Sequence, residues 1–261
     1  MRAAVAPLAL LLAAASVAPL RVPLLAALAI GWVVVRWLKP RQAIAWAATL
    51  PVASILAWAS VYGRDVPLGA AGCSNPLSTI ALSRVLEATA VITVVVILAA
   101  ILRVRPADIG LRRTDHGILA AGVGIGVLAA VGGVVIGPIL AEPFFGKVSF
   151  ALPAAAIVPA LIFGVMNGVM EEVAYRGWLQ NHLRPFIGVA GAIVLQGLVF
   201  GIAHAGPEVT GPLWLHVTQM SAAGIVAGAL AQRFGLLPVI AVHVGADVAL
   251  YFGLACSAAP S

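Results

Sequence analysis

The residues best suited to chemistry are two adjacent glutamates, Glu171 and Glu172, which follow a mostly apolar run of the chain. A carboxylate at the centre of a membrane helix costs about 2.5–3.5 kcal/mol, and such residues indicate a functional site by default. Because no proline falls between positions 161 and 184, we expect one continuous helix there. On it, Glu172 and Arg176 share nearly one face and can pair, whereas Glu171 points about 100° away, on the face of Asn167. We therefore expect the unpaired Glu171 to perform the chemistry.

Two later apolar stretches add further polar side chains. His204 ends the stretch LQGLVFGIAH, in which Phe200 lies four residues earlier on the same helix face. His243 and Asp247 are likewise four residues apart, in PVIAVHVGAD. A lone histidine in such a stretch commonly has a structural role, but each ionisable group is costly in lipid unless the groups meet. The pattern therefore predicts that these side chains gather with the two glutamates in one buried site.

The composition is typical of a polytopic membrane protein. Apolar residues make up 62% of the chain and charged residues 9%, and the mean hydropathy is +1.10. These values exclude an ordinary soluble domain. The predicted fold class is all-α, a polytopic membrane helix bundle of about nine transmembrane helices. The expected spans are approximately residues 3–20, 22–38, 42–62, 84–102, 117–140, 152–183, 187–205, 212–231 and 236–255.

The first of these spans has two interpretations. Arg2, the apolar run after it and the small residues at positions 15–18 together resemble a signal peptide. Its cleavage would leave eight helices. The next apolar run begins after Arg21 alone, and this favours a retained helical hairpin.

The net charge of +6 is interpreted as an orientation signal. Most of the 15 lysine and arginine residues lie in short loops that alternating spans place on the side of the N-terminus. This distribution predicts that the N-terminus lies inside and the C-terminus outside a lipid bilayer. Basic residues do not form a stripe with interleaved aromatic residues, so we expect no nucleic acid partner. The most highly charged stretch, residues 103–117, is expected to form a short interfacial helix.

The polar residues fall into three motifs that resemble those of a known family. The segments 171–176, 200–204 and 243–247 read EEVAYR, FGIAH and HVGAD. In this order they resemble EExxxR, FxxxH and HxxxN (sometimes HxxxD) of the CPBP family. These proteins are the CAAX-protease and bacteriocin-processing intramembrane endopeptidases related to the prenyl-protein protease Rce. The resemblance covers about residues 115–255.

The resemblance implies an intramembrane endopeptidase of a bacterial cytoplasmic membrane, acting on a membrane-associated protein or peptide. Peptide hydrolysis needs an activated water, an acid for the leaving amine and support for the oxyanion. The family pattern implies that Glu171 and His204 activate water. It implies that His243, with Asp247, supports the oxyanion site. The supporting residues would be Asn167, Glu172, Arg176 and Phe200.

One position departs from the family pattern and bears on metal use. Asp247 stands where the family more often has asparagine, and an ionised aspartate can only accept hydrogen bonds. It could orient His243, or complete a zinc site with Glu171, His204 and His243. No HExxH helix is present to support zinc independently. We therefore expect no cofactor, with zinc as the alternative.

The motifs suggest a division of the chain into three parts. Residues 1–62 hold N-terminal spans outside the resemblance. Residues 63–116 hold a variable loop, the fourth span and the basic interfacial segment, and residues 117–255 form the catalytic membrane core. Cys73 and Cys256 are both expected on the oxidising face and could form a disulfide.

Other patterns concern packing and competing functions. The spacings Gly122-xxx-Gly126 and Gly224-xxx-Gly228 allow helices to approach closely. A non-proteolytic membrane scaffold or immunity protein would keep the glutamates for structure, and alanine at Glu171 would distinguish it from a protease. A transporter or proton relay would predict a repeat between the two halves, and the N-terminal half contains no second copy of the motifs.

Overall fold

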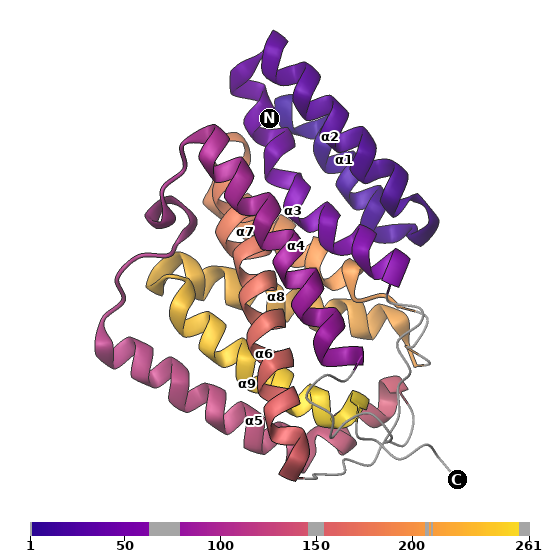
Figure 1. Cartoon of the computed structure of the whole chain (residues 1–261), viewed down its shortest axis with the longest axis vertical. Coiled ribbons are helices and arrows are strands. Elements are labelled where there is room, and N and C mark those ends of the chain that lie inside the picture. The colour runs from indigo at the N-terminus through magenta and orange to yellow at the C-terminus, as the bar shows by residue number, and fades with distance from the viewer. Residues whose placement is uncertain (1, 63–78, 146–153, 207–208, 210, 256–261) are drawn as a thin grey trace.

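The computed structural model describes residues 2–62, 79–145, 154–206, 209 and 211–255. In this part of the chain the secondary structure is helical, which confirms the all-α bundle (Figure 1). The helices are α1 (Arg2–Ser16), α2 (Arg21–Leu38), α3 (Pro40–Tyr62), α4 (Thr79–Leu102), α5 (His116–Phe145), α6 (Ile157–Glu171), the π-helix η5 (Glu172–Gln180), α7 (Asn181–Ala203), α8 (Leu213–Phe234) and α9 (Leu236–Ala255). The expected pairing of Cys73 with Cys256 lies outside the described residues.

The number of membrane crossings is not confirmed at nine. Within the described residues, seven helical segments are long and apolar enough to cross a membrane. One of them, Ala154–Ala203, joins the two spans expected at 152–183 and 187–205. The helical run continues from α6 through η5 into α7 and bends at Gly188, whose φ is 76°. Helix α1 has 15 residues and is about 22 Å long, which is shorter than the hydrocarbon core.

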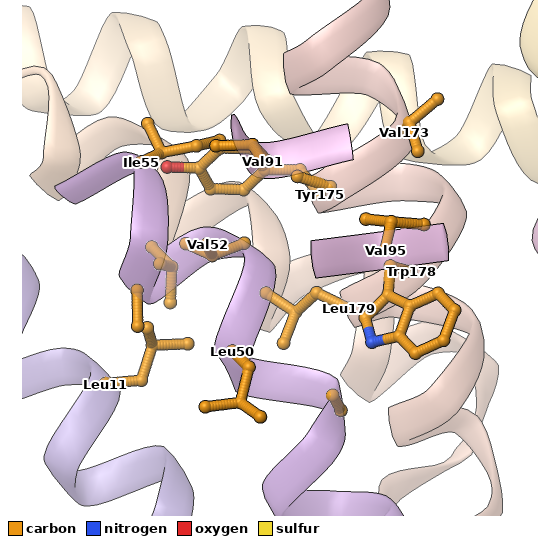
Figure 2. Packing of buried hydrophobic residues seen from close by; sticks show 14 of the residues in the cluster. Leu11, Leu50, Val52, Ile55, Val91, Val95, Val173, Tyr175, Trp178 and Leu179 are labelled. Atoms are coloured by element: carbon orange, nitrogen blue, oxygen red, sulfur yellow. The ribbon is translucent and has the colours of Figure 1, made fainter. Parts of the chain in front are cut away.

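The N-terminal helices pack against the stretch that carries the two glutamates. Helices α1 and α2 lie against α3, and both α3 and α4 contact η5. The residues that form this contact, shown in Figure 2, are Leu50, Val52 and Ile55 of α3, Val91 and Val95 of α4, and Val173, Tyr175, Trp178 and Leu179 of η5. The indole Nε1 of Trp178 also donates a hydrogen bond to the Ala47 carbonyl at 2.9 Å. The first spans therefore bury one side of η5.

The C-terminal helices pair closely through glycines. Helix α5 lies along α9, α6 packs against α9, and α7 packs against α8. A Cβ atom on Gly245 would overlap the carbonyl of Gly126, so α5 and α9 touch through their backbones. A Cβ on Gly224 would lie 2.9 Å from the Cα of Gly197. The close packing predicted at the two small-xxx-small spacings is confirmed, and it fixes where α9 presents its polar residues.

The basic segment differs from the expected interfacial helix. Its helical part is a single 3₁₀ turn, Pro106–Ile109, and the residues after it are held by the ends of α8 and α9. The Nη2 atom of Arg112 donates to the carbonyl of Arg233 at 3.0 Å. The backbone N–H of Leu236 donates to the carbonyl of Gly110 at 3.0 Å. Because an arginine at a helix C-terminus satisfies its last carbonyls, this exposed segment caps α8 and contains only one short helical turn.

Candidate active site

The two glutamates lie at a change of helix type. Glu171 is the last residue of α6, and the next nine residues form the π-helix η5, all of them buried. Turns with i→i+5 hydrogen bonds are rare and occur frequently at functional sites. The expectation of one continuous helix through this stretch is confirmed, but its middle is π-helical and not α-helical. The angular positions predicted from 3.6 residues per turn do not hold there, because the π-helical turn is wider.

Glu172 joins two partners on different helices. Its Oε1 atom lies 3.0 Å from Nη1 of Arg176, which confirms the predicted ion pair. The same oxygen lies 2.7 Å from Nδ1 of His243 on α9. Both members of the glutamate–arginine pair are almost fully buried, with side chains 1% and 2% exposed. Because a carboxylate only accepts hydrogen bonds, the Nδ1 proton of His243 points to Glu172, and this fixes the orientation of the ring.

The other ring nitrogen of His243 faces two further carboxylates. Its Nε2 atom lies 3.6 Å from Oε2 of Glu171 and 3.5 Å from Oδ2 of Asp247. The amide Nδ2 of Asn167 donates to Oδ2 of Asp247 at 2.9 Å. Among the described residues, the buried Oε2 of Glu171 has no hydrogen-bond partner. Polar groups separated by about 3.5 Å or more are suited to bridging by water.

Small residues on α6 make this convergence possible. A Cβ on Gly168 would lie 3.2 Å from Cγ2 of Val244, and one on Gly164 would lie 2.9 Å from the Val244 carbonyl. Larger side chains at these positions would push α6 away from α9. Glu171 stands three residues beyond Gly168, so the close approach of the two helices carries it to His243. Gly164 and Gly168 are a further small-xxx-small spacing in the sequence, which could have indicated this contact.

His204 lies apart from the carboxylates. It follows the last residue of α7, and its Nδ1 atom lies 2.8 Å from the carbonyl of Phe200. Its ring packs on the ring of Phe200, with centroids 4.4 Å apart. The Phe200 ring also contacts the Arg176 guanidinium at 4.3 Å and the His243 ring at 6.4 Å. In the described part of the chain, no hydrogen bond or ion pair joins His204 to Glu171 or Asp247.

A partly buried ion pair on α4 was not expected from the sequence. Arg84 Nη1 lies 2.6 Å from Oε2 of Glu87, and the Glu87 side chain is 4% exposed. The Arg84 guanidinium also lies over the ring of Phe163 on α6, at 5.3 Å. Neither residue is among the site residues expected from the sequence. The signal was available, because Glu87 is an acid inside an apolar run with a cation three residues earlier.

The proposed zinc ligands do not form one group. Among the described residues, no set of three or more His, Cys, Asp or Glu side chains is arranged to hold a metal ion. The separation of His204 from Glu171, His243 and Asp247 is the reason that the four expected ligands do not converge. The arrangement therefore does not fit a four-ligand zinc site.

Comparison with known proteins supports the family resemblance. A family model described as Rce1-like, type II CAAX prenyl endopeptidase, matches residues 153–249. No curated protein and no solved structure matches the chain. The matched residues run from α6 into α9 and include all three motifs, whereas α1 to α5 lie before them. The chain is therefore a multi-pass membrane protein whose residues 153–249 are similar to the Rce1-like family of CAAX-type proteases.

Proposed function

We propose that this protein is an intramembrane endopeptidase in which Glu171 activates the water that attacks a peptide bond. The observation that carries the proposal is the position of Glu171. Its Oε2 atom is buried, lacks a hydrogen-bond partner among the described residues and faces Nε2 of His243 at 3.6 Å. Water held between these two atoms would have an acceptor for its proton on one side. A general base in this position contributes about 10²–10⁴-fold to rate.

The reaction assigns one role to each polar group. The water oxygen attacks the carbonyl carbon of the scissile bond while its proton passes to Glu171. In its doubly protonated form, His243 donates from Nε2 to the oxyanion, while Glu172 keeps the ring in place through Nδ1. As the carbon–nitrogen bond breaks, the leaving amine takes a proton from His204. The proton held by Glu171 then restores His204, so the proton lost by water ends on the amine.

His204 enters this scheme from the opposite side of the substrate. Its ring packs on Phe200, which also contacts His243. A peptide lying beside Phe200 would have the base on one side and the acid on the other. Hydrogen bonds to catalytic groups are often long before the substrate binds and shorten in the complex, so the separation of the two histidines is compatible with these roles.

The match of residues 153–249 to the Rce1-like family model supports a peptide or membrane-protein substrate. We infer a bacterial cytoplasmic membrane as its location, with the N-terminus inside and the C-terminus outside, from the loop charges. Prenylated proteins are not expected in most bacteria, so the tail of a membrane protein or a secreted peptide is the better substrate candidate. Asp247 would help to orient His243, with Asn167 holding its carboxylate.

Quantitative mass spectrometry of protein termini tests the proposal. Host membranes containing the wild-type protein would be compared with membranes containing Glu171→Gln at equal abundance. Glu142→Gln is the control, because Glu142 is an exposed glutamate near the end of α5. New termini in the wild type and the control, absent from Glu171→Gln, are the expected result, and they would also name the substrate. Identical termini in all three membranes under varied growth conditions would instead support the non-proteolytic scaffold.

A further inference from the structure

A polar cavity lies at one end of the bundle, away from the residues assigned to hydrolysis. Its volume is about 300 Å³, and it opens where α8 ends and α9 begins. The side chains that matter for its chemistry are Asp108, Arg112, Arg176, Gln180, Asn181 and Arg184. Glu171, His204, His243 and Asp247 do not line it. The cavity is therefore a second feature of the molecule that the proposed reaction does not use.

The cavity wall is positively charged. Among the described residues that line it, three arginines, Arg112, Arg176 and Arg184, stand against one carboxylate, Asp108. That carboxylate already has a cation of its own, since Arg105 donates to it from Nη2 at 3.2 Å. The hydrogen bonds from Arg105 also hold the pKa of Asp108 below its usual range, so it stays ionised and paired. The wall therefore favours an anion.

Arg176 gives the cavity a buried donor that lacks a partner. Its side chain is only 2% exposed, and its Nε atom has no hydrogen-bond partner among the described residues. Leaving a buried donor of a charged group unsatisfied is costly, so such a donor calls for a bound water, ion or ligand. The amides of Gln180 and Asn181 also line this wall, but their N–H groups already donate to backbone carbonyls. The guanidinium groups are therefore the donors that would bind acceptor oxygens.

The position and size of the cavity identify the kind of anion. It lies beside the basic segment and the ends of α8 and α9, at the end of the bundle that the loop charges place in the cytoplasm. Basic pockets between transmembrane helices on that side bind lipid head groups. A volume of about 300 Å³ is at the small end of ligand pockets, and guanidinium groups bind phosphate through paired N–H donors. We propose that this cavity binds the phosphate of an anionic lipid head group.

The bound phosphate would be linked to the candidate active site. Arg176 lines the cavity and also lies 3.0 Å from Oε1 of Glu172. That oxygen accepts from Nδ1 of His243 at 2.7 Å. A phosphate in the cavity shares the charge of Arg176 with Glu172, and so changes how firmly Glu172 holds the His243 ring. Lipid composition would in this way act on the active site through one guanidinium.

Lipid retention by the purified protein tests the proposal. The full chain in detergent would be mixed with phosphatidylglycerol or with phosphatidylcholine, and bound lipid counted by native mass spectrometry. The test variants are Arg112→Gln and Arg184→Gln. The control is Arg41→Gln, because Arg41 is an exposed arginine at the start of α3 that does not line the cavity. A separate arm adds sodium phosphate as a competitor, which distinguishes a lipid head group from a free phosphate ion.

The expected result is selective retention of phosphatidylglycerol by the wild type and the control. Each test variant should bind it about fivefold more weakly, the effect of one basic side chain near an anionic head group. Asp108→Asn should bind it more tightly, and this opposite change cannot come from poor folding. Displacement of the lipid by phosphate alone would assign the site to the free ion. Equal retention by the wild type and all variants, or equal loss in Arg41→Gln, would overturn the proposal.

Discussion

His243 and His204 belong to motifs of the same length, yet their side chains are held by different kinds of partner. His243 lies among the carboxylates of Glu171, Glu172 and Asp247, at distances of 2.7 to 3.6 Å. His204 follows the end of α7, bonds to a backbone carbonyl and packs on Phe200. One histidine is held in place by side chains from two helices, and the other by its own helix. Equal spacing in the sequence therefore does not imply equal attachment in the fold.

The two glutamates contact opposite nitrogens of the His243 ring and so have different parts in holding it. Glu172 does not act only on its own helix, since it fixes the Nδ1 side of His243 while Arg176 balances its charge. The Nε2 side is thereby left to Glu171 and Asp247. His204 has no comparable support, because its orientation depends on one bond to the Phe200 carbonyl. A substitution of Glu172 should therefore change the orientation of the His243 ring far more than that of the His204 ring.

Removing the cation beside Glu172 is the strongest way to break this arrangement. Arg176→Met would leave a buried carboxylate without its balancing charge, and losses of this kind lower the free energy of unfolding by about 3–5 kcal/mol. Denaturant titration of the protein in detergent would measure the change. Arg105→Gln is the control, because the Arg105–Asp108 pair is exposed to solvent, with side chains 81% and 44% exposed, and exposed pairs contribute little. Equal destabilisation by both substitutions would contradict the role of the buried pair.

Replacing each histidine in turn tests the comparison directly. His243→Ala removes the donor to Glu172 and should lower the free energy of unfolding by about 1–3 kcal/mol. His204→Ala removes one bond to a carbonyl and should lower it by about 0.5–1.5 kcal/mol. Both variants should lose at least about 100-fold in peptide cleavage, because each histidine moves or directs a proton. Unfolding and cleavage would be measured on the same preparations.

An unequal effect on cleavage would change the assignment. If His204→Ala retained wild-type cleavage, the leaving amine would have to take its proton from Glu171. If His243→Ala were as stable as His204→Ala, the hydrogen bond to Glu172 would contribute nothing to the fold. The first result would leave His243 as the one histidine needed for cleavage, and the second would remove the difference in how the two histidines are held.

The sequence predicted the fold class and one ion pair of the site better than the way the helices bring the site together. The apolar composition and the cost of buried charges were sufficient for an all-α membrane bundle and for the ion pair between Glu172 and Arg176. The bond between Glu172 and His243 could not be predicted, because it depends on how closely α6 and α9 approach. That distance is set by Gly164 and Gly168, which have no chemistry of their own. Sequence spacing predicts which side chains share a face of one helix. It does not predict contacts between two helices, and the site depends on such contacts.

The π-helix and the N-terminal contact were missed for related reasons. Residues 172–180 have the composition of an ordinary helix, and the widened turn arises where η5 is enclosed by α3, α4, α7 and α9. Trp178 gave no sign in the sequence that its indole would bond to the Ala47 carbonyl, 131 positions earlier. Long-range contacts of this kind depend on the whole bundle. The three-part division of the chain stays a prediction.

Asp247 offers a smaller test, because the family commonly has asparagine at this position. Asp247→Asn keeps an oxygen that can accept from Nδ2 of Asn167, and its amide can donate towards Glu171. We expect cleavage within about tenfold of the wild type, whereas Asp247→Ala should lose more because it also leaves Asn167 without its partner. Kinetics with a cleaved peptide would give kcat and KM separately. Equal losses in the two variants would show that the carboxylate itself is needed.

Metal removal should have the smallest effect of all. The proposed reaction uses water, Glu171 and two histidines, so treatment with 1,10-phenanthroline should leave the cleavage rate unchanged. A zinc ion bound by Glu171, His204, His243 and Asp247 would require His204 to leave the Phe200 carbonyl and join the carboxylates. The two histidines would then be equivalent ligands, and the contrast between them would disappear. Loss of cleavage that added zinc restores in the wild type, but not in His204→Ala, would establish that alternative and show that the separation of His204 from the carboxylates is not kept in the working enzyme.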